Sequence, residues 1–429
     1  MNFSDSEIVT SILSQEGYEY TRDLALADII FINTCSIREN AEERVRKRLE
    51  YFKSLKRKKP GLIIGLLGCM ADRIQTALVE EEQLLDLVAG PDAYRHLPLL
   101  LGQVGTGRKA IDTILSVDET YAGITPVRFD SNGISAFISI MRGCGNYCSY
   151  CVVPYTRGHE RSRDAGSILN ETSDLFTKGY REVTLIGQNV NSYRWTSPEG
   201  NMDFACLLEK VAAVHPMIRV RFATSHPKDI SDPLLHTIAS HDNICKAIHL
   251  PVQSGSDHIL ERMNRKYTRE QYMERIMAIR RIIPGCAIST DIIAGFCDET
   301  EEDHRQTLSL MEWVRYDFAF MFKYSERPRT LAAETLKDNI PEKVKERRLR
   351  EIIELQQKLS YENNNQDLGK TFSVLIEGES KRSKSQYFGR NSQNKVVVFP
   401  KTDASPGAYI TVKIVRFTSA TLIGEVVKS

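Results

Sequence analysis

The first third of the chain predicts a strand, a helix and a second strand. Residues 29–32 and 62–67 are short apolar runs, as expected for buried strands. Between them, residues 36–59 place apolar side chains at helical spacing and charged side chains elsewhere. The apolar positions are Val45, Leu49, Phe52 and Leu55. Such a βαβ unit has parallel strands that bind ligands at their carboxyl ends, where Cys35 and Cys69 follow.

A longer alternation of strands and helices follows residues 119–133, which contain glycine and proline and are interpreted as a linker. Strands are predicted near residues 136–142, 183–187, 219–224, 246–252, 287–293 and 317–323. Helices are predicted near residues 164–178, 203–214, 232–239, 268–283 and 300–314. This order favours an incomplete parallel barrel, because a full barrel has about eight strand–helix units. A doubly wound sheet fits the pattern almost as well.

The last part of the chain changes from a helical to a strand-like period. Residues 341–365 predict one long helix with a basic start. Beyond residue 367, strands are predicted at 372–377, 396–399, 409–414 and 421–427. They favour a small barrel of about five strands, of the kind that binds oligonucleotides. Residues 366–429 hold ten Lys and Arg against five Asp and Glu, a local net charge of +5.

The overall composition narrows the class of protein but hides that basic segment. The 429 residues carry 57 Lys and Arg against 56 Asp and Glu, which excludes a uniformly basic nucleic-acid coat. No apolar run approaches the ~20 residues that cross a bilayer, and no secretory leader is visible. We therefore expect a cytoplasmic protein without a membrane partner. Nine cysteines in that compartment favour metal ligands or buried thiols over disulfides.

The strongest local signal is a cysteine triplet directly after the strand predicted at 136–142. Cys144, Cys148 and Cys151 have the spacing C-x3-C-x2-C. A 4Fe-4S cluster normally takes four cysteines, so three leave one iron open to a substrate or cofactor. Two alternatives stay open on the residues alone. One is a zinc site completed by a ligand such as His159, and the other is three buried thiols.

This spacing, after the first strand of the series, resembles that of the radical S-adenosylmethionine (SAM) enzymes. The resemblance implies a 4Fe-4S cluster whose open iron binds SAM, with Tyr150 against the adenine. An electron from the cluster then cleaves SAM to methionine and a 5′-deoxyadenosyl radical. Polar residues near the ends of the predicted strands are candidate SAM contacts, although each could equally cap a helix or loop. They are Gln188, Asn189, Arg221, Ser225, Gln253, Ser254 and Asp291.

Further strings resemble the methylthiotransferase branch of the radical SAM enzymes and together span nearly the whole chain. They lie at residues 33–39, 68–71, 143–163, 187–193, 249–256, 289–293, 321–325 and 394–399. The resemblance implies an α/β protein of several parts. These are an N-terminal methylthiotransferase domain at 1–118, the linker at 119–133, a partial (β/α)6 radical SAM barrel at 134–365 and a small RNA-binding β-barrel, called TRAM, at 366–429.

The resemblance also implies an auxiliary 4Fe-4S cluster on three N-terminal cysteines, two of which match Cys35 and Cys69. The family's first auxiliary cysteine stands in a Gly-Cys-Gln-Met-Asn string, and this sequence begins at Met1-Asn2, inside the matching string. We therefore expect a truncated or late start and poor assembly of this cluster. The other cysteines match no ligand motif and are expected to be thiols without a role. They are Cys206, Cys245, Cys286 and Cys297.

The implied reaction adds a methylthio group to C2 of an isopentenyl-adenosine next to the tRNA anticodon. The C2–H bond is unactivated, so a radical is needed, and SAM serves as both methyl donor and radical source. The implied partners are this tRNA, an electron donor such as flavodoxin or ferredoxin, and an iron–sulfur assembly or sulfur-donor system. A monomer is expected.

Basic and aromatic residues near the C-terminus are the candidates for RNA contact, because RNA recognition combines cations with stacking rings. They are Lys381, Arg382, Lys384, Phe388, Arg390, Lys395 and Arg416. The helix predicted at 36–59 is also rich in Lys and Arg. A solvated helix face is the favoured interpretation there, and contact with tRNA phosphates is the alternative.

Other functions compete with this interpretation. Related enzymes use the same plan on threonylcarbamoyl-adenosine in tRNA or on an aspartate of a ribosomal protein. The strings at 144–163 and 289–296 favour the isopentenyl-adenosine enzyme. The alternative of another class is a non-catalytic iron–sulfur RNA-binding or sensor protein, which has no need of an open cluster corner on a barrel.

Overall fold

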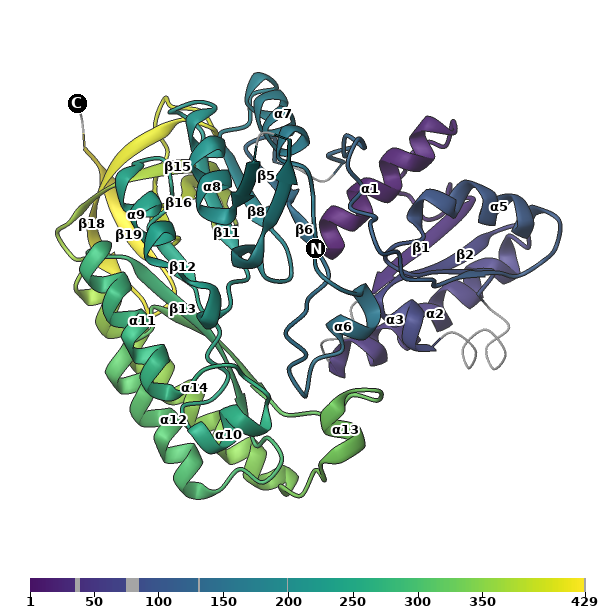
Figure 1. Ribbon diagram of the computed structural model, residues 1–429. Helices are drawn as coiled ribbons and strands as arrows, with labels where there is room; N and C mark the ends of the chain where they lie inside the picture. The colour runs from purple at the N-terminus through teal and green to yellow at the C-terminus, as the bar shows by residue number, and fades with distance from the viewer. Residues whose placement is uncertain (35–38, 75–84, 130–131, 199, 428–429) are drawn as a thin grey trace. The chain divides into compact units, whose positions relative to one another are not determined.

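The computed structural model describes residues 1–34, 39–74, 85–129, 132–198 and 200–427 (Figure 1). The chain forms two compact units. The first consists of Met1–Asp130, Met141–Tyr147 and Cys151–Ser167, and the second of Ser131–Ile140, Cys148–Tyr150 and Ile168–Ser429. The stretch that carries the cysteine triplet therefore contributes to both units.

A parallel sheet forms the centre of the first unit. In the described chain its strand order is β1-β2-β3-β4, and every neighbouring pair is parallel. The strands are β1 (Ile29–Thr34), β2 (Ile63–Gly68), β3 (Leu87–Ala89) and β4 (Ala110–Asp112). Helix α2 (Glu39–Lys58) connects β1 to β2, which confirms the predicted βαβ unit, and α3 (Cys69–Ile74) starts directly after β2.

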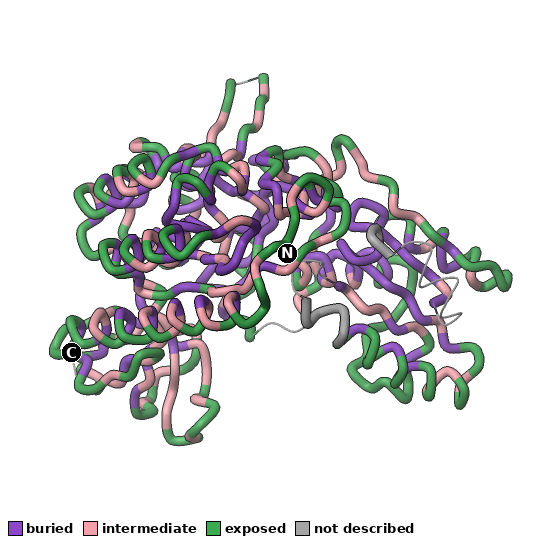
Figure 2. Tube along the Cα trace, turned by 90° about the horizontal axis from the view of Figure 1, so that it is seen from below, coloured by how far each residue is buried: buried purple, intermediate pink, exposed green. Residues whose placement is uncertain are grey.

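Helices pack on both faces of this sheet. Leu49 and Phe52 of α2 are 0% and 2% exposed and share an apolar core with Ile64 of β2, as the helical stripe predicts. On the other face, α1 (Asn2–Gln15) and α5 (Leu97–Gly105) form a separate core. Figure 2 shows this division, with buried strands and exposed outer sides of helices.

Helix α1 has no counterpart in the sequence-based prediction, because its buried face is partly polar. Ser4, Asp5, Glu7 and Ser11 are all buried. Glu7 is ion-paired with Arg128, so burial of its charge is compensated within the same unit. A helix of this kind shows little of the apolar periodicity that reveals α2.

Buried carboxylates of the first unit bind the arginines that flank the cysteine triplet. Asp5 accepts hydrogen bonds from Arg142 Nη1 at 2.9 Å and from Arg157 Nη2 at 2.7 Å, one at each carboxylate oxygen. Asp92 accepts a hydrogen bond from Arg161 Nη1 at 2.8 Å. We call these five residues the carboxylate clamp.

A short antiparallel ladder reinforces the clamp. Strand β6 (Met141–Arg142) pairs with β7 (Arg161–Ser162), with Arg142 opposite Arg161. Helix α6 (Val153–Arg157) lies in the chain between them. The segment with the cysteines is thus closed at its base by both main-chain and side-chain hydrogen bonds.

A series of parallel strands forms the second unit. They are β5 (Ser135–Ser139), β8 (Glu182–Ile186), β11 (Arg219–Ala223), β12 (Ala247–His249), β13 (Ala287–Ala294) and β14 (Phe318–Lys323). In the described chain they pair in the orders β5-β8-β11 and β12-β13-β14. A parallel bridge between Val220 and Ile244 joins the two sets. Each strand follows its neighbour in sequence, which agrees with a partial barrel and not with a doubly wound sheet, whose order reverses.

Helices follow these strands, and all but α10 and α13 lie close to predicted positions. They are α7 (Ala165–Thr177), α8 (Phe204–Ala213), α9 (Asp232–Ser240), α10 (Asp257–Arg262), α11 (Arg269–Ile282), α12 (Glu301–Val314), α13 (Leu331–Thr335) and α14 (Glu342–Asn365). Capping boxes at Thr268 and Thr300 start α11 and α12. The short helices α10 and α13 and the hairpin of β9 (Arg194–Ser197) and β10 (Gly200–Asp203) were not predicted.

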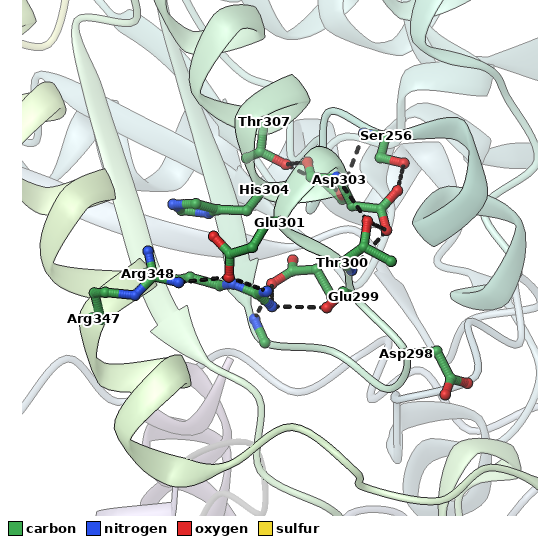
Figure 3. A network of polar contacts seen from close by, with 12 residues as sticks. Ser256, Asp298, Glu299, Thr300, Glu301, Asp303, His304, Thr307, Arg347 and Arg348 are labelled. Carbon is green, nitrogen blue, oxygen red and sulfur yellow. Dashed lines mark hydrogen bonds and ion pairs between the residues drawn. The ribbon is translucent and has the colours of Figure 1, made fainter.

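A buried ion pair fastens α14 to the loop before α12 (Figure 3). Arg348 Nη1 donates to the main-chain oxygen and to Oε2 of Glu299, both at 2.9 Å, and Arg348 Nη2 donates to Glu301 at 2.7 Å. Gly295 N also donates to Glu299 Oε2, at 2.8 Å. Burial raises the pKa of Glu299 to about 7, against the opposing effect of these donors.

The C-terminal strands close into a small barrel. In residues 371–426, all of them described, the order is β15-β16-β17-β19-β18. The strands are β15 (Thr371–Ser380), β16 (Ser383–Arg390), β17 (Val396–Pro400), β18 (Tyr409–Phe417) and β19 (Leu422–Val426). The predicted barrel is thereby confirmed, although β16 was not predicted. At Gly389 a Cβ would lie 1.9 Å from Leu375 O, so only glycine permits this close packing of strands.

The stability of the metal-free protein should depend on the charge of Asp5. Burial opposes that charge, but Arg142 and Arg157 outweigh burial and lower the pKa from 3.8 to about 2. Asp5 therefore stabilises the fold above pH 3.8, and this stability is lost as the pH falls towards 2. Urea unfolding should show a loss on the order of 2 kcal/mol over that range.

Asp5→Asn should flatten this pH dependence. It should also lower stability at pH 7 by about 3 kcal/mol, because the two guanidinium groups lose their buried counter-charge. Glu16→Gln, at the exposed end of α1, is the control and should change neither quantity. An Asp5→Asn protein that loses stability in acid as steeply as the unchanged protein would contradict this role.

Candidate functional site

The base of the cysteine loop is packed too closely for any residue but glycine at position 143. Gly143 has a φ of +78°, and a Cβ there would lie 1.9 Å from His159 O. Cys144 N donates to Gly158 O at 3.1 Å, which brings the two ends of the segment together within the first unit. The loop is therefore closed directly before its first cysteine.

The middle of the loop belongs to the second unit, where it is bound to the end of α10 and to α13. Ser149 N donates to Met263 O at 3.0 Å, and Ser149 Oγ donates to Arg262 O at 2.7 Å. Ala332 N of α13 donates to Ser149 O at 2.7 Å. Tyr150 packs edge-on against Phe296, with the ring centroids 6.4 Å apart. These contacts fix the main chain directly after Cys148.

Two of the loop cysteines accept hydrogen bonds at sulfur. Cys148, which is 8% exposed, lies 3.3 Å from Arg265 Nη1, and Cys144 lies 3.5 Å from Asn146 Nδ2. His159, the suggested zinc ligand, has its Nδ1 3.5 Å from the Tyr147 hydroxyl.

The residues present fit an iron–sulfur cluster by the chemistry of their donors. Soft thiolate ligands in a C-x3-C-x2-C spacing, with N–H groups aimed at sulfur, suit such a cluster. None of the described cysteines is in a disulfide. Within the described ranges, no three His, Cys, Asp or Glu side chains stand together as a metal-binding group.

Cys69 lies at the carboxyl end of β2, as predicted, and Cys35 lies outside the described residues. Cys69 is 3% exposed and is the first residue of α3. Arg157 of the carboxylate clamp donates from Nε to its sulfur at 3.2 Å. Gly68, with a φ of +90°, makes the sharp turn between strand and helix.

Four of the polar residues predicted to contact SAM have buried atoms without a partner. Among the described residues, no hydrogen bond involves Gln188 Oε1, Asn189 Oδ1, Ser225 Oγ or Arg221 Nη1. Asn189 is oriented by a 2.7 Å bond from its Nδ2 to Asp229. Unsatisfied buried polar atoms at the carboxyl ends of β8 and β11 are what a ligand site requires.

The other predicted contacts are engaged within the protein. Ser254 is fully buried with its Oγ 3.3 Å from Thr307. Asp291 lies 3.4 Å from His249 Nε2, and Gln253 has a φ of +71° beside β13. Arg221 uses its other nitrogens within the protein, donating to Glu182 at 2.7 Å and to Asn391 O at 2.9 Å.

Asn191 and His226 were missed by the sequence reasoning. Neither amide atom of Asn191 has a partner among the described residues, although the side chain is 7% exposed. His226 Nδ1 accepts a hydrogen bond from Lys228 N at 3.3 Å, which leaves Nε2 as a donor without a partner in the described chain. Burial lowers the pKa of His226 to about 2. The sequence signal that could have identified both residues is the group of polar residues that follows the end of each predicted strand.

The basic residues of the small barrel divide into exposed and engaged groups. Among the residues predicted to contact RNA, the exposed cations are Lys381, Arg382, Lys384 and Arg416. Phe388 is half-buried on β16. Lys395 instead forms ion pairs with Asp317 at 3.1 Å and Asp367 at 2.8 Å, and Arg390 lies 3.8 Å from Glu377. Only the exposed group is presented to a partner in this structure.

Three of the cysteines predicted to have no role are in surroundings that favour the neutral thiol. Burial raises the thiol pKa of Cys245, of Cys297 and, to about 12, of Cys286. Cys206 lies in α8. No helix in the described ranges is both long and apolar enough to cross a membrane.

Family profiles match the chain in three consecutive segments. Residues 1–90 match the profile described as uncharacterized protein family UPF0004, residues 138–311 that of the radical SAM superfamily, and residues 366–427 that of the TRAM domain. Solved structures with a similar fold include the radical SAM methyltransferase TsrM from Kitasatospora setae. The TM-score is 0.57 at 16% identity, over 77% of this chain and 72% of that chain.

Curated relatives are similar over almost the entire length. The tRNA-2-methylthio-N(6)-dimethylallyladenosine synthase of Amoebophilus asiaticus is 58% identical, over 99% of this chain and 90% of the relative. The synthase of the same name from Parabacteroides distasonis is also 58% identical, over 100% and 93%. The chain therefore belongs to the radical SAM methylthiotransferase family whose members include these tRNA-2-methylthio-N(6)-dimethylallyladenosine synthases.

Proposed function

We propose that this protein adds a methylthio group to C2 of isopentenyl-adenosine next to the anticodon of tRNA. The observation that carries the proposal is identity above 50% over nearly full length to synthases of that name. The intact C-x3-C-x2-C loop at the end of β5 and β6 supports it, because the reaction must break an unactivated C–H bond.

Cys144, Cys148 and Cys151 are the residues that hold the cluster to which SAM binds. That cluster supplies the electron for reductive cleavage of SAM. The chain's own part is to orient SAM and exclude water, and we assign this to Tyr150 in the loop and to the unsatisfied polar atoms of Gln188, Asn189 and Ser225. We also assign the wall of that site to the carboxyl ends of β8 and β11, because ligands of parallel barrels bind at the carboxyl ends of the strands.

We further propose an auxiliary 4Fe-4S cluster that uses Cys35 and Cys69. Support comes from the position of Cys69 at the end of a parallel strand, buried and hydrogen-bonded by Arg157. This cluster would receive the methyl group of one SAM molecule on sulfur, so a sulfur-donor or iron–sulfur assembly system is required. An electron donor such as flavodoxin or ferredoxin would reduce the SAM cluster.

The small barrel is the proposed contact for tRNA. Lys381, Arg382 and Lys384 stand at the exposed turn between β15 and β16, where cations can displace counterions from phosphates. Arg416 is exposed on β18 of the same barrel. A tRNA substrate also places the proposed reaction in the cytoplasm, and we expect a monomer to suffice.

Mass spectrometry of tRNA nucleosides tests the substrate. The protein, reconstituted anaerobically and given SAM and a reductant, should convert isopentenyl-adenosine in tRNA to its 2-methylthio derivative. Transcribed tRNA without the isopentenyl group is the control and should yield none. Product on threonylcarbamoyl-adenosine or on a ribosomal-protein aspartate instead would replace the proposed substrate by that alternative.

Cys148→Ala should abolish formation of 5′-deoxyadenosine and remove about four iron atoms per chain, because one 4Fe-4S cluster loses a ligand. Cys206→Ala, in α8, is the matched control and should keep both quantities. Liquid chromatography of the SAM products and a colorimetric iron assay measure them. Formation of 5′-deoxyadenosine at the unchanged rate in Cys148→Ala would refute the radical assignment.

A further inference from the structure

Arg265 is a buried guanidinium whose nitrogens are all engaged by the surroundings of Cys148. It is 8% exposed and follows α10 in the second unit. Its Nε donates to the Tyr267 hydroxyl at 3.0 Å, Nη2 to Pro251 O at 2.8 Å and Nη1 to Cys148 Sγ at 3.3 Å. The Tyr267 ring lies 5.1 Å from the guanidinium carbon, which restricts its plane further.

The partners of Arg265 leave its charge without a carboxylate. Within the described chain Arg265 forms no ion pair, whereas its neighbour Arg262 is ion-paired with Asp298. A buried cation without a counter-charge costs several kcal/mol, so native proteins pair such groups. Among the hydrogen-bond partners of Arg265 given above, Cys148 Sγ is the one that becomes an anion on binding a metal, since a cysteine ligand is a thiolate, whereas burial raises the pKa of Tyr267 to about 12.

The segment around Arg265 is also built to hold its position. Asn264 has a φ of +54°, which turns the chain sharply at the end of α10. The main-chain oxygens of Arg262 and Met263 accept the hydrogen bonds of Ser149. Hydrogen bonds thus join the segment that carries Cys148 to the segment that carries Arg265, and hold the two side chains in position against each other.

We infer that Arg265 is a positioning residue of the radical SAM centre, which neutralises the Cys148 thiolate and raises the reduction potential of the cluster bound there. The inference rests on the proposed function only in placing a cluster on Cys144, Cys148 and Cys151. A cation and an N–H donor at a ligand sulfur favour the electron-rich, reduced state, since both attract the added negative charge. Removing Arg265 makes the cluster harder to reduce.

Redox titration followed by electron paramagnetic resonance tests this without tRNA. The background is Cys35→Ala/Cys69→Ala, so that the signal comes from the SAM cluster alone. Arg265→Met should lower the equilibrium constant for reduction at least tenfold, which for one electron is a 59 mV shift to more negative potential. Arg265→Lys keeps the charge but loses the planar guanidinium. Its reduction potential should therefore lie between those of Arg265→Met and the unchanged protein.

Arg262→Met is the matched control, because it removes a positively charged side chain three residues away, at the end of α10, that is ion-paired with Asp298 and does not contact Cys148. It should shift the equilibrium less than threefold. A potential for Arg265→Met within twofold of the unchanged protein, or a shift as large in Arg262→Met, would overturn the inference. If Arg265→Met takes up fewer than about four iron atoms, Arg265→Lys decides, and an unshifted potential there overturns it.

The nucleoside assay separates this inference from the proposed function. A shifted potential without methylthiolated nucleoside refutes the proposed substrate and leaves the role of Arg265 standing. Methylthiolated nucleoside together with an unshifted potential supports the proposed substrate and refutes the role of Arg265.

Discussion

Opposite charges buried on both sides of the cysteine triplet hold this part of the molecule together. Arg142 and Arg157 each take one oxygen of Asp5, and Arg161 binds Asp92. Both carboxylates come from the α/β unit around β1 to β4, so the N-terminal part of the chain anchors this loop across 137 positions of sequence from Asp5 to Arg142 and 69 from Asp92 to Arg161. Loss of Asp5 would leave Arg157 without its buried carboxylate partner.

Arginine also donates to two of the sulfurs proposed as cluster ligands, in two different electrostatic settings. Arg157 contacts Cys69 and is ion-paired with Asp5. Arg265 contacts Cys148 with no carboxylate partner in the described chain. No carboxylate therefore offsets the charge of Arg265 beside Cys148, whereas Asp5 offsets that of Arg157 beside Cys69. The same residue type gives the two cysteines different surroundings.

Periodicity in the sequence predicts the elements that bury a continuous apolar stripe. The strands of the partial barrel, α2 and α14 all appear close to their predicted positions for that reason. It misses α1, whose buried face includes Asp5 and Glu7, because those side chains are compensated by arginines far away in sequence. Long-range ion pairs leave no local pattern.

The candidate site, like the fold, is predicted from the sequence only in part. The spacing of the cysteines identifies the loop, and strand ends identify Gln188, Asn189 and Ser225, but a sequence does not reveal whether a polar atom already has a partner. Lys395 illustrates this, since only the fold brings Asp317 and Asp367 to it. Arg265 was overlooked because it follows α10, a short helix that itself was not predicted.

The bonds between the partial barrel and the small barrel have an evolutionary consequence. Arg219 and Arg221 of β11 reach across to the main-chain oxygens of Arg390 and Asn391, at 2.6 and 2.9 Å. Every amino acid offers that carbonyl, so these bonds constrain the path of the backbone at 390 and 391 without specifying the residue type, although the buried Asn391 side chain also accepts a hydrogen bond from Lys395 N. An RNA-binding module can accordingly diversify its surface, or be exchanged for another with the same turn, while its attachment to the catalytic barrel is inherited unchanged.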